Sequence, residues 1–433
     1  MRFARTGEVN MQILLKGGRV VDAVNGVDEK LDILIDGERI AKVGKSIEAH
    51  SGCEVVDCGG LTVIPGICDM HVHLRDPGQT HKEDVYTACE AAAAGGVTAV
   101  ACMPNTNPSV DTPETVNYIL EKAKTAKAKV YPVGAITKGL KGEEFTDFAA
   151  LKAAGCVAVS DDGRPVKNAR MMKQAIADSV KNGMFVTSHC EDLDIIDGGI
   201  INDGKVAKEL GVKGMARSSE NLITAREILL ASELDLPIHI AHVSTKEAVK
   251  IIRFAKKNGV KVTCETAPHY FMLTEDKLRA KDADYRMNPP LREQEDVEAI
   301  TAGVLDGTID CIVTDHAPHA AEEKADFLKA PNGVVGLETS FAASFTTLVG
   351  TGLMSLSRLV EIMCVNPRKI LGVEGGSLAE GDVADIAVVN TEESWTVQPE
   401  KLHSRSKNTC FKGMTLTGKV KYTFKDGKMV FKD

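Results

Sequence analysis

The residues of this sequence that are best suited to chemistry are histidines and aspartates that follow short apolar runs. The set comprises His71, His73, Asp161, Asp162, His189, His242, Asp315 and His316. Imidazole and carboxylate groups together form a ligand set that suits Zn²⁺, and Mn²⁺ or Co²⁺ fits the same donors. The sequence therefore indicates a site for divalent metal ions without selecting the metal.

Two of these histidines, His71 and His73, form a His-x-His pattern inside an apolar run. Side chains alternate between the two faces of a strand, so both imidazoles would point the same way. A single histidine at a strand end is commonly structural, whereas four histidines with aspartates favour metal binding. Six ligands are too many for one tetrahedral ion with an open position, and a carboxylate shared by two ions accommodates them. Two divalent ions, two carboxylates and one hydroxide would leave a charge of about +1, which favours an anionic substrate.

These residues lie in a middle region, roughly residues 62–371, that alternates apolar runs with helical patterns. Eight runs are expected to be strands whose carboxyl ends fall near residues 73, 104, 136, 162, 189, 242, 268 and 315, and the long intervals before 242 and 315 imply insertions. Eight consecutive strand–helix units favour a closed (β/α)8 TIM barrel over an open doubly wound sheet, and the first unit lacks the G-x-G-x-x-G turn of a dinucleotide fold. Because active sites of such barrels lie at the carboxyl ends of the strands, the histidines and aspartates would share one mouth.

Helix boundaries in this region carry recognisable capping patterns. Thr80-x-x-Glu83 and Ser244-x-x-Glu247 have the form of capping boxes, in which the two side chains cap each other's backbone amides. Pro113 follows Thr112 at an expected helix start.

The two ends of the chain resemble each other and differ from the middle. Residues 11–57 and 376–433 alternate short β-type runs with Gly and Asp-Gly turns, which is typical of antiparallel β-meanders. We therefore predict an α/β protein with a catalytic barrel over residues 62–371 and a small composite β-sandwich domain. Both chain termini, residues 1–61 and 372–433, would build that second domain.

The composition excludes several classes of protein. Hydrophobic residues make up 43% and charged residues 26% of the 433 residues, which is enough apolar material for a buried core. The net charge of −9 and an aromatic content of 4%, with Trp395 as the single tryptophan, argue against binding to nucleic acid or anionic membranes. The 11 cysteines form no C-x-x-C pair, and no segment reaches the roughly 18 apolar residues of a membrane span. A cytoplasmic protein with reduced thiols is expected.

Several motifs resemble those of the amidohydrolase superfamily, in its dihydroorotase branch. PGICDMHVHLRDPG (65–78) is similar to the first-strand signature of the superfamily, and GSLAEGDVADIAVVN (376–390) resembles the segment that re-enters its small β-domain. Further motifs match the branch in order: VACMPNT (100–106), HCED (189–192), HVSTKE (242–247), MNPPLR (287–292) and TDHAPH (314–319). The similarity covers nearly the whole chain from Met11, and it is most like the bacterial class I dihydroorotases.

The resemblance implies a role for each matching residue. The metal ligands would be His71 and His73 on one ion, Asp162 as the bridge, His189 and His242 on the second ion, and Asp315, which would also shuttle the proton. The substrate-binding residues would be His73, Arg75, Asn105, Asn288, His319, Asn332 and Gly333, with Arg75 as a fork for the substrate carboxylate. The implied cofactor is Zn²⁺, with two ions per chain and one ion as the alternative.

Some features leave alternatives open. Much of the superfamily bridges its metals with a carboxylated lysine, whereas this fourth strand ends in Asp162, which leaves one or two metals open. Relatives often have Phe where Asn332 stands, so the contact of that residue with substrate is open. Taken alone, Arg75 could neutralise Asp76, Asn105 and Asn288 could form turns, and His319 could be a loop residue. The loop of residues 319–334 suits either a mobile flap or a solvated loop.

The implied reaction is the reversible cyclisation of N-carbamoyl-L-aspartate to L-dihydroorotate in pyrimidine biosynthesis. In the hydrolytic direction a metal-activated hydroxide would attack the ring amide carbonyl, and Asp315 would pass the proton to the leaving nitrogen. Cyclisation consumes a carboxylate and a proton, so acid should favour the ring.

Two other functions stay open at this point. A dihydropyrimidinase, hydantoinase or allantoinase would use the same barrel and metals on a different cyclic amide. A non-catalytic dihydroorotase-like partner of aspartate transcarbamoylase would use the fold without the chemistry. Besides its small-molecule substrate, the expected partners are a second copy in a homodimer and an aspartate transcarbamoylase, with no nucleic acid or membrane.

Overall fold

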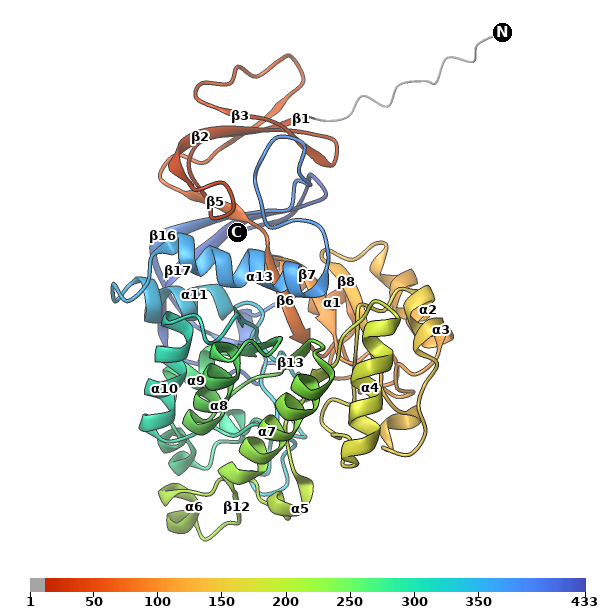
Figure 1. Cartoon of the computed structure of the whole chain (residues 1–433). Coiled ribbons are helices and arrows are strands. Elements are labelled where there is room, and N and C mark those ends of the chain that lie inside the picture. The colour runs from red at the N-terminus through yellow and green to blue at the C-terminus, as the bar shows by residue number, and fades with distance from the viewer. Residues whose placement is uncertain (1–11) are drawn as a thin grey trace.

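The computed structural model describes residues 12–433 and places the strands of both chain ends side by side at one end of the molecule (Figure 1). The first and last segments of the chain, red and blue in the figure, meet there, and the strand–helix region lies beyond them. The prediction that the two termini build one β-structure is confirmed.

The terminal β-structure is a single sheet of eight strands. Its members are β1 (Gln12–Asp22), β2 (Val27–Asp36), β3 (Arg39–Gly44), β4 (Glu54–Asp57), β5 (Thr62–Pro65), β16 (Ile386–Thr396), β17 (Thr415–Lys425) and β18 (Lys428–Lys432). The strand order is β18-β17-β16-β5-β1-β2-β3, with β4 paired to β1. Alternating side chains of these strands, among them Leu15, Ile33, Ile386 and Phe424, bury a separate apolar core.

The strand β5 joins the two ends of the chain. It pairs in parallel with β1, where Val20 lies opposite Val63, and antiparallel with β16, where Ala387 lies opposite Ile64. Residues 62–65 therefore belong to the terminal sheet, although the predicted boundary at residue 61 assigned them to the barrel. The division of the chain into domains at residues 61 and 372 stays a prediction.

The middle of the chain forms a closed barrel of eight parallel strands. They are β6 (Ile67–Val72), β7 (Val97–Cys102), β8 (Lys129–Ala135), β9 (Ala158–Ser160), β10 (Thr187–Ser188), β13 (Ile238–Ile240), β14 (Val262–Thr266) and β15 (Cys311–Ile312). Two four-stranded sheets, β6-β7-β8-β9 and β10-β13-β14-β15, are joined by the parallel bridges Val159–Val186 and Val72–His316, which close the ring. The strands are buried, as in β7, in which each residue is buried, because helices cover their outer faces.

Helices follow the strands and cover the barrel. The longer ones are α1 (Val85–Ala94), α2 (Pro113–Ala123), α3 (Phe148–Ala154), α4 (Ala169–Lys181), α7 (Arg217–Leu234), α8 (Lys246–Lys257) and α10 (Gln294–Leu305). The predicted insertions contain α5 (Leu193–Ile196), β11 (Ile201–Asn202), α6 (Lys205–Leu210), β12 (Gly214–Met215), α9 (Pro268–Met272), η2 (Glu275–Ala280) and η3 (Ala283–Tyr285). The remaining segments are η1 (Lys138–Leu140), α11 (Ser340–Ser344), η4 (Phe345–Val349), α12 (Leu356–Val360), η5 (Glu361–Val365), α13 (Asn366–Leu371) and η6 (Pro399–Lys401). Among residues 12–433, no helix combines the length and apolar character that crossing a membrane requires.

The capping patterns are confirmed at one helix and wrong at two. Thr112 caps α2 with Pro113 in the first turn, as expected. The cap of α1 is Asp84 and not Thr80, because the Glu83 carboxylate is buried and accepts a hydrogen bond from Ser404. The cap of α8 is Thr245, one residue after the predicted Ser244.

Candidate active site

The carboxyl ends of the barrel strands bring the predicted metal ligands into one buried cluster around Asp162. Its Oδ1 atom lies 3.5 Å from Nε2 of His71 and 3.5 Å from Nδ1 of His189. The same oxygen lies 3.9 Å from Nε2 of His242, and Oδ2 lies 3.6 Å from Nε2 of His73. His71 and His242, which are 171 positions apart in the sequence, thus face one carboxylate with their ring centroids 5.0 Å apart.

The cluster divides into two groups of three ligands that share Asp162. One group is His71, His73 and Asp162, the other is Asp162, His189 and His242, and the ligand atoms within each group lie within 4.8 Å of one another. Nε2 of His71 and Oδ1 of Asp162 are buried without a hydrogen-bond partner among residues 12–433. Burying such atoms without a partner costs free energy, and a cation between them would satisfy both. The residues therefore fit a divalent metal site.

Charges around the cluster hold protons on two of its imidazoles. Burial alone would lower the pKa of His71, but Glu265 and Asp162 raise that pKa well above its ordinary value. Burial likewise opposes a charge on His189, but Asp162 and Glu191 raise its pKa to about 10. The pKa of the Asp162 carboxyl is held well below its usual range by His189 and His71, despite burial. The carboxylates of the cluster therefore favour bound cations. When no metal ion is bound, His71 and His189 carry an extra proton instead.

In three of the histidines, the ring nitrogen that faces away from Asp162 lies within hydrogen-bonding distance of a carboxylate or amide oxygen. Nδ1 of His71 lies 2.6 Å from Oε1 of Glu265, and Nδ1 of His73 lies 2.8 Å from Oδ1 of Asn105. Nε2 of His189 lies 3.2 Å from Oε2 of Glu191. Such contacts fix the orientation and tautomer of a metal-binding imidazole. Sequence analysis missed Glu265 and Glu191, although Glu265 stands out as an acidic residue inside an apolar strand.

The backbone takes a left-handed conformation at three residues of the barrel mouth. The φ angles are 58° at Arg75, 28° at His242 and 48° at Asp315. Residues other than glycine avoid this region, and such a conformation costs about 1–3 kcal/mol where the surrounding structure imposes it. The conformation aims these three side chains into the mouth and is typical of functional positions.

Asp315 lies over the first ligand group without being part of either group. Its Oδ1 atom is 3.1 Å from Nε2 of His73 and 3.7 Å from Nε2 of His71. Burial would raise the pKa of Asp315, but the hydrogen bond with His73 and the nearby histidine charges lower it below its ordinary value. Asp161, which precedes Asp162 in the fourth-strand Asp-Asp pair, is turned to the backbone and accepts hydrogen bonds from Ile136 N and Thr137 N.

The cluster opens into a cavity of about 190 Å³. The cavity is lined by His73, Arg75, Asn105, Asp162, Gly163, His189, His242, Asn288, Asp315, Ala317, His319, Asn332 and Gly333. Each predicted site residue except His71, which lies beneath the others, therefore borders this one space. The cavity is small, so it suits a compact ligand.

Polar contacts fix the side chains around the cavity. Nε of Arg75 donates to the carbonyl of Pro318 at 3.1 Å, and its Nη2 lies 3.3 Å from Nε2 of His319. Burial and the charges of Arg75 and Lys82 lower the pKa of His319 to about 2, so its ring is neutral. Nδ1 of that ring faces Lys82 Nζ at 3.4 Å, and Nε2 donates to the Asn332 carbonyl at 2.9 Å. Asn288 lies across the cavity and donates to Glu191 Oε1 at 3.0 Å.

The loop of residues 319–334 is braced from within and from the C-terminal segment. The buried Lys324 ammonium donates to the carbonyl of Pro331 at 3.0 Å and to that of Gly333 at 3.0 Å. The Asn408 side chain donates to the same Gly333 carbonyl at 3.0 Å and accepts from His319 N at 3.2 Å. No sequence pattern pointed to either brace, and a mobile flap and a solvated loop both stay predictions for this segment.

Comparisons with known proteins agree with this site. A family model described as "Dihydro-orotase-like" matches residues 60–248. The dihydroorotase of Trichlorobacter lovleyi is 50% identical over 423 residues, which cover 97% of this chain and 99% of that protein. The dihydroorotase of Geotalea daltonii is 51% identical over 424 residues, 98% of this chain and 100% of that protein. The dihydroorotase of Acetivibrio thermocellus is 48% identical over 423 residues, 97% of this chain and 99% of that protein.

Solved structures with the same fold include cyclic-amide hydrolases. The L-hydantoinase (dihydropyrimidinase) from Arthrobacter aurescens matches with a TM-score of 0.87 at 27% identity, over 97% of this chain and 96% of that chain. The dihydropyrimidinase from Brevibacillus agri matches with a TM-score of 0.86 at 25% identity, over 98% of this chain and 95% of that chain. With full-length relatives at about half identity and a buried metal-type ligand cluster at the barrel mouth, the chain belongs to the dihydroorotase family of the amidohydrolase superfamily.

Proposed function

We propose that this enzyme catalyses the reversible cyclisation of N-carbamoyl-L-aspartate to L-dihydroorotate, a step of pyrimidine biosynthesis. The observation that carries the proposal is the pairing of two ligand groups around Asp162 with Asp315 and the buried Arg75 in one small cavity. An anionic substrate with a cyclic amide needs each of these parts: a metal site for the amide, a proton carrier, and a cation for the carboxylate.

The ligand set supports two Zn²⁺ ions per chain, with one ion as the alternative. His71 and His73, together with Asp315, would hold one ion, His189 and His242 the other, and Asp162 would be shared. When bound there, such ions supply a coordinated water of lowered pKa and polarise a substrate carbonyl oxygen. Glu265 and Glu191, which contact His71 and His189, would keep these imidazoles oriented toward the ions.

Asp315 is the proton carrier of the proposed reaction. Its lowered pKa leaves it ionised near neutral pH, so it can accept the proton of the attacking water. In hydrolysis the oxygen adds to the ring amide carbon, the carbon–nitrogen bond breaks, and Asp315 returns the proton to the leaving nitrogen. In cyclisation the same carboxylate takes the proton from the attacking nitrogen and passes it to the departing oxygen.

The other cavity residues would bind and orient the substrate. Arg75 would pair with the substrate carboxylate through two parallel N–H donors, and Asn105 and His319 would lie beside it. Asn288 would contact the ring from the opposite wall, with Asn332 and Gly333 closing the space and His73 reaching both substrate and metal. The neutral state of His319 means that it would act as a hydrogen-bonding group and would not add a second positive charge.

A hydantoinase or dihydropyrimidinase activity is the competing function, because the solved structures of the same fold carry those names. Hydantoin and dihydrouracil lack the carboxylate that Arg75 would bind, so Arg75 separates the two cases. Purified enzyme should be assayed on N-carbamoyl-L-aspartate, L-dihydroorotate, hydantoin, dihydrouracil and allantoin, with metal per chain measured on the same sample. Turnover of hydantoin or allantoin without turnover of dihydroorotate would reject the proposed reaction.

The variant Arg75→Gln sharpens this assay. Because a buried charge pair would lose one partner, kcat/KM for dihydroorotate should fall at least about 100-fold. Residual activity on dihydrouracil should change little, since that substrate would make no pair with Arg75.

The cellular setting is a further part of the proposal. The relatives are named as dihydroorotases, which supports an enzyme acting on small molecules, and the 11 free cysteines support a reducing, cytoplasmic setting. A homodimer and an association with aspartate transcarbamoylase are proposed, and mass measurement in solution with and without that enzyme tests both. The complete ligand set supports catalysis over a purely structural role in such a complex.

A further inference from the structure

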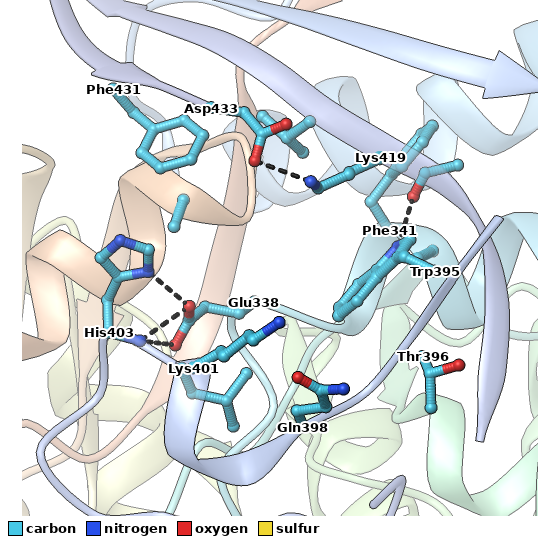
Figure 2. Close-up of a pocket in the computed structure, with 15 residues that line it drawn as sticks. Glu338, Phe341, Trp395, Thr396, Gln398, Lys401, His403, Lys419, Phe431 and Asp433 are labelled. Carbon is cyan, nitrogen blue, oxygen red and sulfur yellow. Dashed lines mark hydrogen bonds and ion pairs between the residues drawn. The ribbon is translucent and has the colours of Figure 1, made fainter. Parts of the chain in front are cut away.

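A second cavity, of about 470 Å³, lies between the terminal sheet and the adjoining helices α1 and α11 (Figure 2). It shares no lining residue with the cavity at the barrel mouth. Its walls come from β16, β17 and β18, from the segment 398–403 that follows β16, and from Glu338 just before α11. Neither the ligand cluster nor the proposed reaction uses any of these residues.

Aromatic rings form two sides of this cavity. Trp395 stands on β16, is half-buried, and donates from Nε1 to the carbonyl of Gly418 at 3.3 Å, which fixes the plane of the indole. Figure 2 shows the indole across the cavity from His403 and Phe431, whose rings meet edge to face at 5.6 Å. A held indole beside open space is a stacking surface for a flat ring.

The carboxylates of the cavity are already occupied. Glu338 accepts from His403 N at 2.7 Å, from His403 Nδ1 at 2.8 Å and from Ser404 N at 3.0 Å. Asp433 lies 2.8 Å from the ammonium of Lys419 and 2.5 Å from that of Lys421. These two side chains therefore already have hydrogen-bond or ion-pair partners within the protein.

Lys401 is the charged group that remains. Its ammonium forms no ion pair or side-chain hydrogen bond among residues 12–433, and Figure 2 shows its side chain extending into the cavity between His403 and Trp395. Gln398 borders the same space and offers an amide group, whereas the Thr396 hydroxyl is turned away and lies 3.3 Å from that of Thr415. The cavity thus combines a stacking surface, one unpaired cation and a neutral amide.

We propose that this cavity binds a nucleoside 5′-monophosphate, with the base stacked on Trp395 and the phosphate paired with Lys401. The volume of about 470 Å³ is more than twice that of the barrel-mouth cavity and lies in the range of roughly 300–1,000 Å³ that is typical of small-molecule sites. Gln398 would contact the base edge or the sugar. Apart from Lys401, the ionisable side chains of the walls named above have partners within the protein, so the proposed role of the site is binding and not catalysis.

The sequence supplies a direct reporter for this binding. Trp395 is the single tryptophan of the chain, so intrinsic tryptophan fluorescence reports this cavity alone. Titrating the holoenzyme with uridine or adenosine 5′-monophosphate should quench the fluorescence to saturation. Uridine without phosphate, and inorganic phosphate without a base, should each bind at least about fivefold more weakly, because each lacks one of the two contacts.

Two pairs of variants test the two contacts. Lys401→Met should weaken binding at least about threefold, whereas Lys428→Met, which removes an exposed lysine of β18 outside the cavity, should leave the affinity unchanged. Trp395→Leu should weaken binding at least about fivefold, as measured by calorimetry because the variant has no tryptophan. Trp395→Phe keeps an aromatic ring, so its affinity should stay within about threefold of wild type.

Three results would overturn the proposal. The first is fluorescence that does not change up to millimolar nucleotide. The second is equal affinity of Lys401→Met and Lys428→Met for the nucleotide. The third is quenching that inorganic phosphate alone reproduces with the same affinity.

Discussion

Glu265 connects a predicted metal ligand to a second buried histidine that lies deeper in the barrel. Its Oε1 atom is 2.6 Å from Nδ1 of His71, and its Oε2 atom is 3.1 Å from Nε2 of His239. All three side chains are buried, and His239 is held in turn by Thr263 at 2.8 Å. The Nδ1 proton of His71 therefore points to Glu265, so Nε2 is the ring atom that faces Asp162 and would bind a metal ion once it has lost its proton.

The variant Glu265→Gln should bind metal about 10–100-fold more weakly than wild type, because a neutral amide orients His71 less firmly and lowers its basicity. The affinity is measured by competition with a chromophoric chelator, so the readout does not depend on turnover. Glu275→Gln is the matched control, since Glu275 is also buried but contacts Asn202 and the backbone of Val206 outside the site. Equal metal affinity in both variants and wild type would assign Glu265 to packing alone.

Metal binding should release about two protons per chain near neutral pH. The raised pKa values of His71 and His189 mean that both imidazoles carry an extra proton in the metal-free enzyme, and an imidazole must lose that proton before it can bind a metal ion. The sign follows: apparent metal affinity rises as pH increases through 7 and levels off above the raised pKa values. Calorimetric titration with Zn²⁺ in buffers of different ionisation enthalpy counts the protons. Affinity that is independent of pH between 6 and 8 would contradict the protonated state of the empty cluster.

The barrel and its ligand residues could be predicted because each is marked locally in the sequence. Buried parallel strands read as short apolar runs, and a polar residue marks the point where each strand leaves the core. The predicted strand ends agree with the structure within three residues, the largest difference being at β15, which ends at Ile312 against a predicted 315. Since side chains at those ends share one mouth, the ligand cluster followed from the fold.

The remaining features depend on contacts between distant segments. Glu83 had the form of a capping residue, but its carboxylate is recruited by Ser404, which is 321 residues away in the sequence. Asn408 braces His319 and Gly333 from the C-terminal segment, and β5 is drawn into the terminal sheet by β1 and β16. No local sequence pattern predicts such contacts, because the residues around one partner do not indicate which distant residue will pack against it in the fold.

The variant Gly333→Ala should raise KM at least about tenfold with a smaller effect on kcat, since the change lies at the substrate cavity and away from the ligand cluster. A Cβ atom at this position would lie 2.7 Å from the Ala317 carbonyl and 3.0 Å from Nε2 of His319, and the φ angle of 141° already disfavours a side chain. Gly381→Ala is the control, because its φ of 92° is also unfavourable but a Cβ there would meet nothing within 4 Å. Steady-state kinetics on dihydroorotate separates the two, and an equal KM for both variants would show that backbone strain alone is responsible.

The variant Asp315→Asn tests the proton carrier directly. An amide cannot accept the proton, so kcat should fall about 10²–10⁴-fold in both directions of the reaction. Asp315 is also a proposed ligand of the ion at His71 and His73, so metal per chain is measured on the same sample, and the other three ligands of that ion should keep most of it bound. Asp310→Asn is the matched control, since Asp310 precedes the same strand at its opposite end and pairs with Lys256 at 2.6 Å. Metal content that falls in proportion to activity in Asp315→Asn would assign the residue to metal binding and remove its role as the proton carrier.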